Sequence, residues 1–99
     1  MKDERVITLL QVKVLPQYRD EIVQVVLQNT LPTRAEAGVE AYFQTTRKDD
    51  PNTLLFFAVF SSQAAYDSHV QMEHAKNTFA AFYGKLADEP LRTKLIELH

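Results

Sequence analysis

The chain has 99 residues, a formal net charge of -2 and no cysteine. Its hydrophobic fraction of 45% and charged fraction of 24% are ordinary for a folded domain and exclude a disordered chain. The lack of cysteine excludes disulfides and thiolate-bound metals. A weak negative charge with scattered Lys and Arg argues against nucleic-acid binding. Because neither a signal peptide nor a membrane-length apolar run is visible, we expect a single cytoplasmic domain over residues 1–99 with no nucleic-acid or membrane partner.

The first part of the chain predicts a strand followed by a helix. Residues 6–15 are mostly apolar or β-branched and predict a strand, which Pro16 ends because proline lacks the N–H that a sheet needs. Residues 17–29 carry apolar side chains at three- and four-residue spacing and predict an amphipathic helix. Residues 31–37 are expected to extend it only as a broken turn around Pro32, before Gly38 stops it.

The second part predicts a hairpin, two helical pieces and a last strand. Strands at residues 39–47 and 53–61 flank a polar turn at residues 48–52. An N-cap at Ser61 or Ser62 precedes a helix over residues 63–70, and a longer helix over residues 72–86 is expected to continue through Gly84. Residues 88–90 break the pattern, and residues 94–98 predict a short strand. The order β-α-β-β-α-β predicts an α+β, ferredoxin-like fold with a four-stranded antiparallel sheet.

The third predicted strand is apolar on both faces. Every residue from 54 to 60 is apolar, and successive strand side chains point to opposite faces, so Leu55, Phe57 and Val59 share one face. Two helices cover only one face of such a sheet. The other face is either left with an exposed aromatic residue, which is common, or is covered by a partner. We expect a homodimer through this face, because Phe57 and its neighbours would otherwise form a sizeable apolar patch.

His69 and Tyr66 are the strongest candidates for chemistry. They lie three residues apart on one side of the predicted helix, where an imidazole and a phenol hydroxyl could bind and deprotonate a phenol-like or hydroxy-ketone substrate. Tyr42, Phe56 and Phe60 are candidates for a pocket wall. Each also has a structural interpretation, since a histidine can be a hydrogen-bonded helix residue at a pocket rim and aromatic rings can simply pack in the core.

The remaining histidines are His74 and the terminal His99. His69 and His74 are five residues apart, which on a continuous helix turns them about 140° from each other. They would then not share a ligand, unless a kink near residues 70–72 redirects one of them. Glu73 lies four residues after His69 and could share its face. The spacing is poor for a site of His69, Glu73 and His74, so we expect no bound metal.

Two stretches resemble the antibiotic biosynthesis monooxygenase family. Residues 36–42, EAGVEAY, are similar to its E-x-G-C-x-x-Y segment. Residues 56–70, FFAVFSSQAAYDSHV, are similar to its segment in which E-x-W precedes an alanine and a histidine, and His74 and Phe79 fall where a further His and Phe tend to follow. The family's glutamate and tryptophan are Ala58 and Phe60 here. The resemblance covers nearly the whole chain and implies a dimeric α/β barrel with a pocket between sheet and helices in each subunit.

The resemblance also implies an activity. Some family members oxidise quinols or polycyclic aromatic phenols with molecular oxygen and without metal or flavin. Haem-degrading members use an asparagine of the first strand and the tryptophan, where Leu9 or Leu10 and Phe60 stand here, so haem degradation is not expected. We expect a cofactor-independent monooxygenase acting on a small quinol-like or aromatic substrate. Its catalytic residues would be His69 and Tyr66, and its substrate-binding residues Tyr42, Phe56, Phe60 and His74.

Two alternatives stay open. One is an isomerase of a small hydroxy-carbonyl compound, either phosphorylated or not, because one family branch isomerises a phosphorylated sugar derivative. It would need an acid and a base on opposite sides of one carbon pair, and cations near the phosphate for which Arg34, Arg47 and Arg92 are candidates. The other is a ligand-binding barrel without catalysis.

Overall fold

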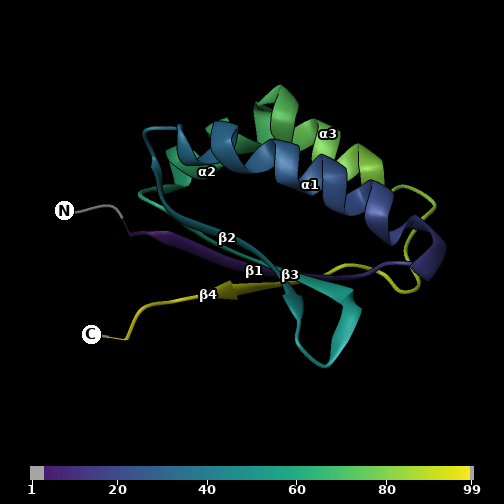
Figure 1. Cartoon of the computed structure of the whole chain (residues 1–99). Coiled ribbons are helices and arrows are strands. Elements are labelled where there is room, and N and C mark those ends of the chain that lie inside the picture. Colours follow the sequence, from purple (N-terminus) through teal and green to yellow (C-terminus); the bar gives the residue numbers. More distant parts are fainter. Residues whose placement is uncertain (1–3, 99) are drawn as a thin grey trace.

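The computed structural model describes residues 4–98 (Figure 1). His99 therefore lies outside the described residues. The predicted α+β, ferredoxin-like fold is confirmed: four strands form one antiparallel sheet in the order β2-β3-β1-β4, and the helices lie together on one face of it (Figure 1). The elements in chain order are β1 (Val6–Lys13), η1 (Pro16–Tyr18), α1 (Arg19–Arg34), β2 (Val39–Arg47), β3 (Asp50–Phe60), α2 (Gln63–Gln71), α3 (Glu73–Phe82) and β4 (Leu91–Leu95).

The core lies between the sheet and the helices. On β3, alternation puts one set of side chains toward the helices, and all of them are buried: Leu54, Phe56, Ala58 and Phe60. Strand β1 adds Leu10 and Val12, which pair with Phe56 and Leu54 across the ladder. Ile22 and Val26 of α1 and Phe82 of α3 pack on Leu54 and Phe56 in one cluster with these two β1 residues. Ala58 and Phe60 form a second cluster with Tyr42. The apolar residues that recur every second position in the strands and about every 3.6 positions in the helices therefore pack together in a single layer.

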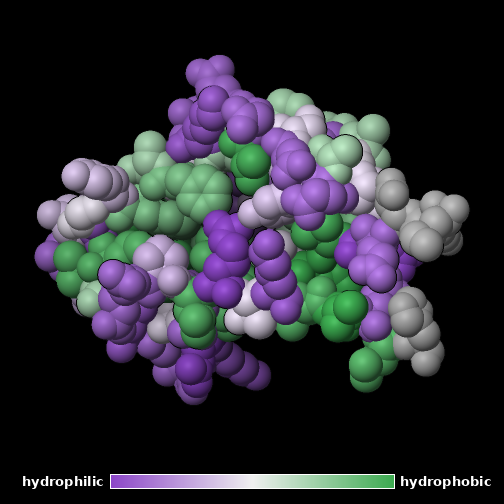
Figure 2. Space-filling view, turned by 180° about the vertical axis from the view of Figure 1, so that it is seen from behind, coloured by the Kyte–Doolittle hydropathy of each residue, from purple (hydrophilic) through white to green (hydrophobic). Residues whose placement is uncertain are grey.

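The opposite face of the sheet carries no helix among residues 4–98 (Figure 1). Leu55, Phe57 and Val59 point to this face and are half-buried in the single chain. Phe43, which pairs directly with Phe57 and so shares its face, is 53% exposed. Leu91 of β4 belongs to the same face and is 58% exposed. Figure 2 shows the molecule from behind with this face pointing down, so the face is seen only from the side, and in that view hydrophobic residues reach the surface between hydrophilic ones.

Helix α1 is longer than predicted. It runs without interruption from Arg19 to Arg34 and includes Pro32, so the broken turn expected around Pro32 is wrong. Proline removes one hydrogen bond, to the carbonyl of Gln28 four residues earlier. Both Gln28 and Pro32 are exposed, so water can satisfy that carbonyl. Thr33, which is fully buried, secures the last turn against the sheet.

Other boundaries also differ from the sequence prediction. The hairpin is confirmed, but its turn is only the two residues 48–49 and β3 begins at Asp50. The second long helix ends at Phe82, and Gly84 follows it with a positive φ of 72°, so Gly84 does terminate the helical region. The last strand covers Leu91–Leu95 rather than residues 94–98. No helix within residues 4–98 has the length and apolar character needed to cross a membrane.

Candidate functional site

A cavity of about 50 Å³ lies between the sheet and the helices. Most of its wall is apolar or aromatic, and its lining includes Tyr42, Phe56, Phe60, Tyr66 and His69. These are five of the six residues that the sequence predicts for catalysis or substrate binding. The sixth, His74, does not line the cavity but contacts Glu36 beside it. The fold therefore brings the predicted residues from β2, β3 and α2 to one place.

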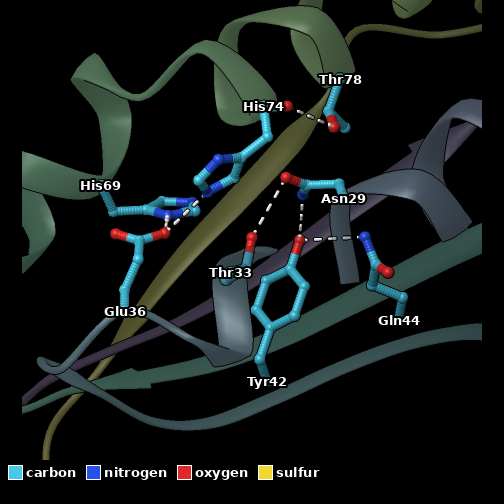
Figure 3. A network of polar contacts seen from close by, with 8 residues as sticks. All are labelled: Asn29, Thr33, Glu36, Tyr42, Gln44, His69, His74 and Thr78. Atoms are coloured by element: carbon cyan, nitrogen blue, oxygen red, sulfur yellow. Dashed lines mark hydrogen bonds and ion pairs between the residues drawn. The ribbon is translucent and has the colours of Figure 1, made fainter. Parts of the chain in front are cut away.

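Two histidines converge on one carboxylate next to this cavity. His69 Nδ1 lies 2.7 Å from Glu36 Oε2, and His74 Nε2 lies 2.8 Å from the same oxygen. Figure 3 shows both imidazole rings directed toward the Glu36 carboxylate. The side chains of Glu36, His69 and His74 are 11%, 10% and 21% exposed, so this Glu36–His69–His74 cluster is largely shielded from water.

A helix break explains why both histidines reach Glu36. Met72 is the C-cap of α2 and the N-cap of α3, with extended backbone angles of φ -69° and ψ 144°. The chain changes direction there, and the 140° separation expected for a continuous helix does not apply. The kink near residues 70–72 that the sequence left open is present, and His69 and His74 share Glu36 as a partner. Glu73, which the sequence suggested as their companion, is exposed and outside the cluster.

Gly38 brings the Glu36 turn close to α2. A Cβ added to Gly38 would lie 2.4 Å from the Cβ of Ala65, which is closer than any side chain allows. The backbone carbonyl of Gly38 also accepts a hydrogen bond of 2.8 Å from the N–H of Ser61, just before α2. This close approach holds the turn between α1 and β2 against the start of α2. Glu36 thus reaches His69, although 33 residues separate them in sequence.

The contact with Glu36 sets the tautomer of His69. A carboxylate only accepts hydrogen bonds, so in a neutral His69 the facing Nδ1 carries the hydrogen and Nε2 holds the lone pair. The ring packs beside Phe60, with the centroids 5.2 Å apart, and beside Tyr42 at 6.3 Å. Because His69 also borders the cavity, its arrangement is that of a general base oriented by an acidic residue.

Tyr66 and Arg92 form the second polar feature of the cavity wall. Arg92 Nη1 donates a 2.8 Å hydrogen bond to the hydroxyl oxygen of Tyr66. The Arg92 guanidinium also lies 5.6 Å from the centroid of the Phe79 ring. Of the three candidate cations, only Arg92 lines the cavity. Arg34 instead donates to the backbone carbonyl of Tyr42, and Arg47 pairs with Asp49 in the hairpin turn.

Tyr42 is held in a buried hydrogen-bond network (Figure 3). Its hydroxyl oxygen accepts hydrogen bonds from Asn29 Nδ2 at 2.8 Å and from Gln44 Nε2 at 3.0 Å. Thr33 in turn donates to Asn29 Oδ1. Burial raises the pKa of the Tyr42 hydroxyl, although these hydrogen bonds act in the opposite direction. Tyr42 therefore remains protonated at neutral pH and serves as a fixed polar point of the wall.

Sequence reasoning missed the role of Glu36 and of Arg92. Glu36 lies in a turn, outside every periodic segment, and only the family-like stretch 36–42 drew attention to it. Arg92 was one of three equivalent candidates, because the predicted last strand began after it. Its register, opposite Leu10 of β1, puts Arg92 on the helix side of the sheet. Neither position could be derived without the register and the helix break.

Comparison with known proteins agrees with this architecture. Residues 5–81 match the family model described as antibiotic biosynthesis monooxygenase. No curated protein matches the chain. A solved structure of Rv0793 from Mycobacterium tuberculosis is 25% identical, with a TM-score of 0.88 and coverage of 96% of both chains. A candidate antibiotic biosynthesis monooxygenase from Nitrosomonas europaea has a TM-score of 0.89 at 12% identity and covers 100% of this chain and 95% of its own, which is a likeness of fold.

A candidate monooxygenase from Lactobacillus acidophilus NCFM is also 25% identical, with a TM-score of 0.86. The match covers 96% of this chain but only 45% of that protein, so this chain spans about half of its length. The family model accounts for most of the described chain and carries the assignment. From its sequence match and its fold, the chain belongs to the antibiotic biosynthesis monooxygenase family.

Proposed function

We propose that this protein is a cofactor-independent monooxygenase of a small quinol-like or phenolic substrate. The observation that carries the proposal is the position of His69, whose Nδ1 is held by Glu36 while its ring borders a mostly apolar cavity. Membership of the monooxygenase family supports the reaction type. The substrate class is inferred from the cavity and from the chemistry that one base can support.

The reaction needs a base but no external reductant. His69 Nε2 would remove the proton of a phenol, and the electron-rich phenolate would then react with dioxygen. In the conversion of a phenol to a quinone, one oxygen atom enters the ring and the other leaves as water. The substrate supplies both hydrogens of that water and all the electrons, so atoms and electrons balance. An apolar wall favours this step because it limits competing solvation of the reacting groups.

Tyr66 and Arg92 would hold the substrate oxygen. Because Arg92 donates to the Tyr66 oxygen, the Tyr66 hydroxyl hydrogen is free to donate to the substrate. The positive charge of Arg92 would stabilise the phenolate that His69 creates. Tyr42, Phe56 and Phe60 would contact the ring. His74 would act indirectly, through Glu36, and so position His69 rather than bind the substrate as predicted.

The cavity is smaller than an aromatic substrate. About 50 Å³ accommodates water, whereas pockets for larger ligands measure roughly 300–1,000 Å³. Binding therefore requires side chains at the surface end of the cavity to move. Phe79 is 41% exposed and Arg92 is exposed, and both line the cavity, so these two are the side chains best able to swing outward.

Arg92 also favours the second candidate, an isomerase of a phosphorylated hydroxy-carbonyl compound. Its guanidinium at the cavity suits a phosphate, with His69 as base and Tyr66 as acid. The third candidate, a ligand-binding barrel without catalysis, needs only the cavity. Dioxygen distinguishes them, because neither isomerisation nor binding consumes it.

A screen of oxygen consumption tests the proposal. Purified protein, freed of metal with a chelator, is mixed with a panel of hydroquinones, naphthols and simple phenols, and oxygen uptake and product are measured. We expect uptake with at least one phenol and the corresponding quinone as product. Tyr66→Phe should reduce it, while Tyr83→Phe should not, because Tyr83 is 88% exposed and away from the cavity. Isomerisation of a phosphorylated substrate without oxygen uptake would replace this proposal by the second candidate.

We also propose that the active form is a homodimer. The open sheet face carries Phe43 and Leu91, each more than half exposed, beside the half-buried Phe57. A second copy of the same face offers matching apolar surface, as a two-fold interface requires. The chain is only 11.4 kDa, and small domains gain burial by association. This pairing would complete the α/β barrel implied by the family resemblance.

A further inference from the structure

The Glu36–His69–His74 cluster combines the side chains that transition metals prefer. It offers two imidazole nitrogens and one carboxylate oxygen, all within 4.8 Å of one another. Within residues 4–98, no other group of three His, Cys, Asp or Glu residues meets this criterion. Two histidines and one carboxylate, with further positions left to water, form an established donor set for Zn²⁺ and related ions.

We propose that this cluster is a binding site for a divalent first-row transition metal. In a tetrahedral zinc site, donor atoms about 2.0–2.1 Å from the metal lie roughly 3.3 Å from each other. The two nitrogens now lie 2.7 and 2.8 Å from Glu36 Oε2, as hydrogen bonds require. These two contacts need to open by about 0.5 Å for an ion to take the place of the two hydrogens. The two nitrogens, which lie within 4.8 Å of each other, need to reach the same spacing.

The surroundings favour this exchange. All three side chains are at most 21% exposed, so little ordering is needed for them to bind. They come from three different segments: the turn after α1, the end of α2 and the start of α3. The close approach of Gly38 to Ala65 holds the first segment, and the break at Met72 sets the angle between the other two. Imidazole and carboxylate ligands select Zn²⁺, Co²⁺ or Ni²⁺ over the harder Mg²⁺.

Metal binding would prevent His69 from acting as a general base. A metal on Nδ1 takes the lone pair of that nitrogen, and the ring hydrogen then resides on Nε2. His69 Nε2 could donate a hydrogen bond but could not accept a proton. The hydrogen-bonded cluster and the metal-bound cluster are therefore two exclusive states of the same residues, and the ion would act as an inhibitor of general-base chemistry at His69.

Metal binding can be measured without any substrate. Chelator-treated protein is dialysed against micromolar Zn²⁺, and Co²⁺ is added separately to record visible absorption. We expect one ion per chain and a Co²⁺ spectrum typical of fewer than six ligands. Glu36→Gln and His74→Ala should each weaken binding by at least about 100-fold, since even residues outside the metal shell contribute 10–100-fold. Glu73→Gln, at the exposed neighbour of His74, and His99→Ala should bind like the wild type.

Two outcomes of these binding measurements would overturn the proposed metal site. No Zn²⁺ or Co²⁺ binding to the wild type at micromolar concentration would overturn the proposal. Binding that survives in both Glu36→Gln and His74→Ala would place the ion elsewhere and overturn it as well. Circular dichroism checks that both variants are folded. If His74→Ala is unstable, Glu36→Gln still tests the site, because glutamine keeps the size and one acceptor oxygen of Glu36. Failure of the oxygen assay alone would leave these binding results unaffected.

Discussion

The contact between Gly38 and Ala65 gives the sharpest test of how the site is built. In Gly38→Ala the new methyl would meet the Cβ of Ala65 at 2.4 Å, and neither atom can rotate away. Overpacking of this kind typically costs about 1–3 kcal/mol. Alanine also lowers the conformational entropy of the unfolded chain, which would stabilise the folded state by only about 0.4–1 kcal/mol. We therefore expect a net loss of unfolding free energy, because the turn or α2 must shift.

Removing the opposing methyl should rescue this variant. Ala65→Gly alone costs up to about 1 kcal/mol through helix propensity. If the clash is the cause, Gly38→Ala/Ala65→Gly should be no less stable than Ala65→Gly, with a coupling free energy of roughly 1–3 kcal/mol. Urea unfolding followed by circular dichroism gives all four values, provided the m-value is unchanged.

The other glycine supplies the control. Gly84 has a φ of 72° and open space around its missing Cβ, so Gly84→Ala should lose stability through backbone strain alone. Ala65→Gly should not rescue it. Full stability of Gly38→Ala, or a double variant that merely shows the sum of the two losses, would refute the role assigned to this contact.

Two further predictions concern the sheet and its network. Phe57→Asp would bury two unpaired charges in the proposed dimer, each costing several kcal/mol. Sedimentation should therefore show a monomer or an unfolded chain for the variant and twice 11.4 kDa for the wild type. A stable dimeric variant would contradict the proposed interface. Tyr42→Phe leaves the Asn29 and Gln44 donors unpaired and should cost about 1–3 kcal/mol. Because burial raises the pKa of Tyr42, the folded state holds its proton more tightly than the unfolded state, so stability should fall as pH rises above about 10. Tyr42→Phe should lose that part of the alkaline decline, and an identical decline in both proteins would contradict the assignment.

The fold followed from local patterns because each pattern was strong. The apolar run on β3 and the period of α1 define the two layers, and the single polar turn defines the hairpin. Errors arose where a local rule met tertiary context. Pro32 is tolerated because Gln28, whose carbonyl it leaves without its helical partner, is exposed to water. The last strand was predicted at residues 94–98, whereas its pairing with β1 covers Leu91 to Leu95.

The site could be predicted only in part. His69 and Tyr66 share a helix face, and their common cavity follows from simple periodicity. The convergence of His69 and His74 depends on an extended residue at Met72, which propensity does not indicate because methionine is a good helix former. Glu36 reaches them through a close backbone approach at Gly38. A glycine in sequence suggests a helix stop or such an approach equally well.

We propose that His69 is the base that activates a phenol in the cavity for reaction with dioxygen. The most direct test is turnover per folded molecule for His69→Ala, measured on metal-free protein with whichever phenol consumes oxygen in the screen. We expect the rate to fall by about 10²–10⁴-fold with the fold retained, while His99→Ala keeps full turnover. The melting temperature of the same preparations separates this from a structural role. A His69→Ala protein that melts lower but turns over at the wild-type rate would contradict the account.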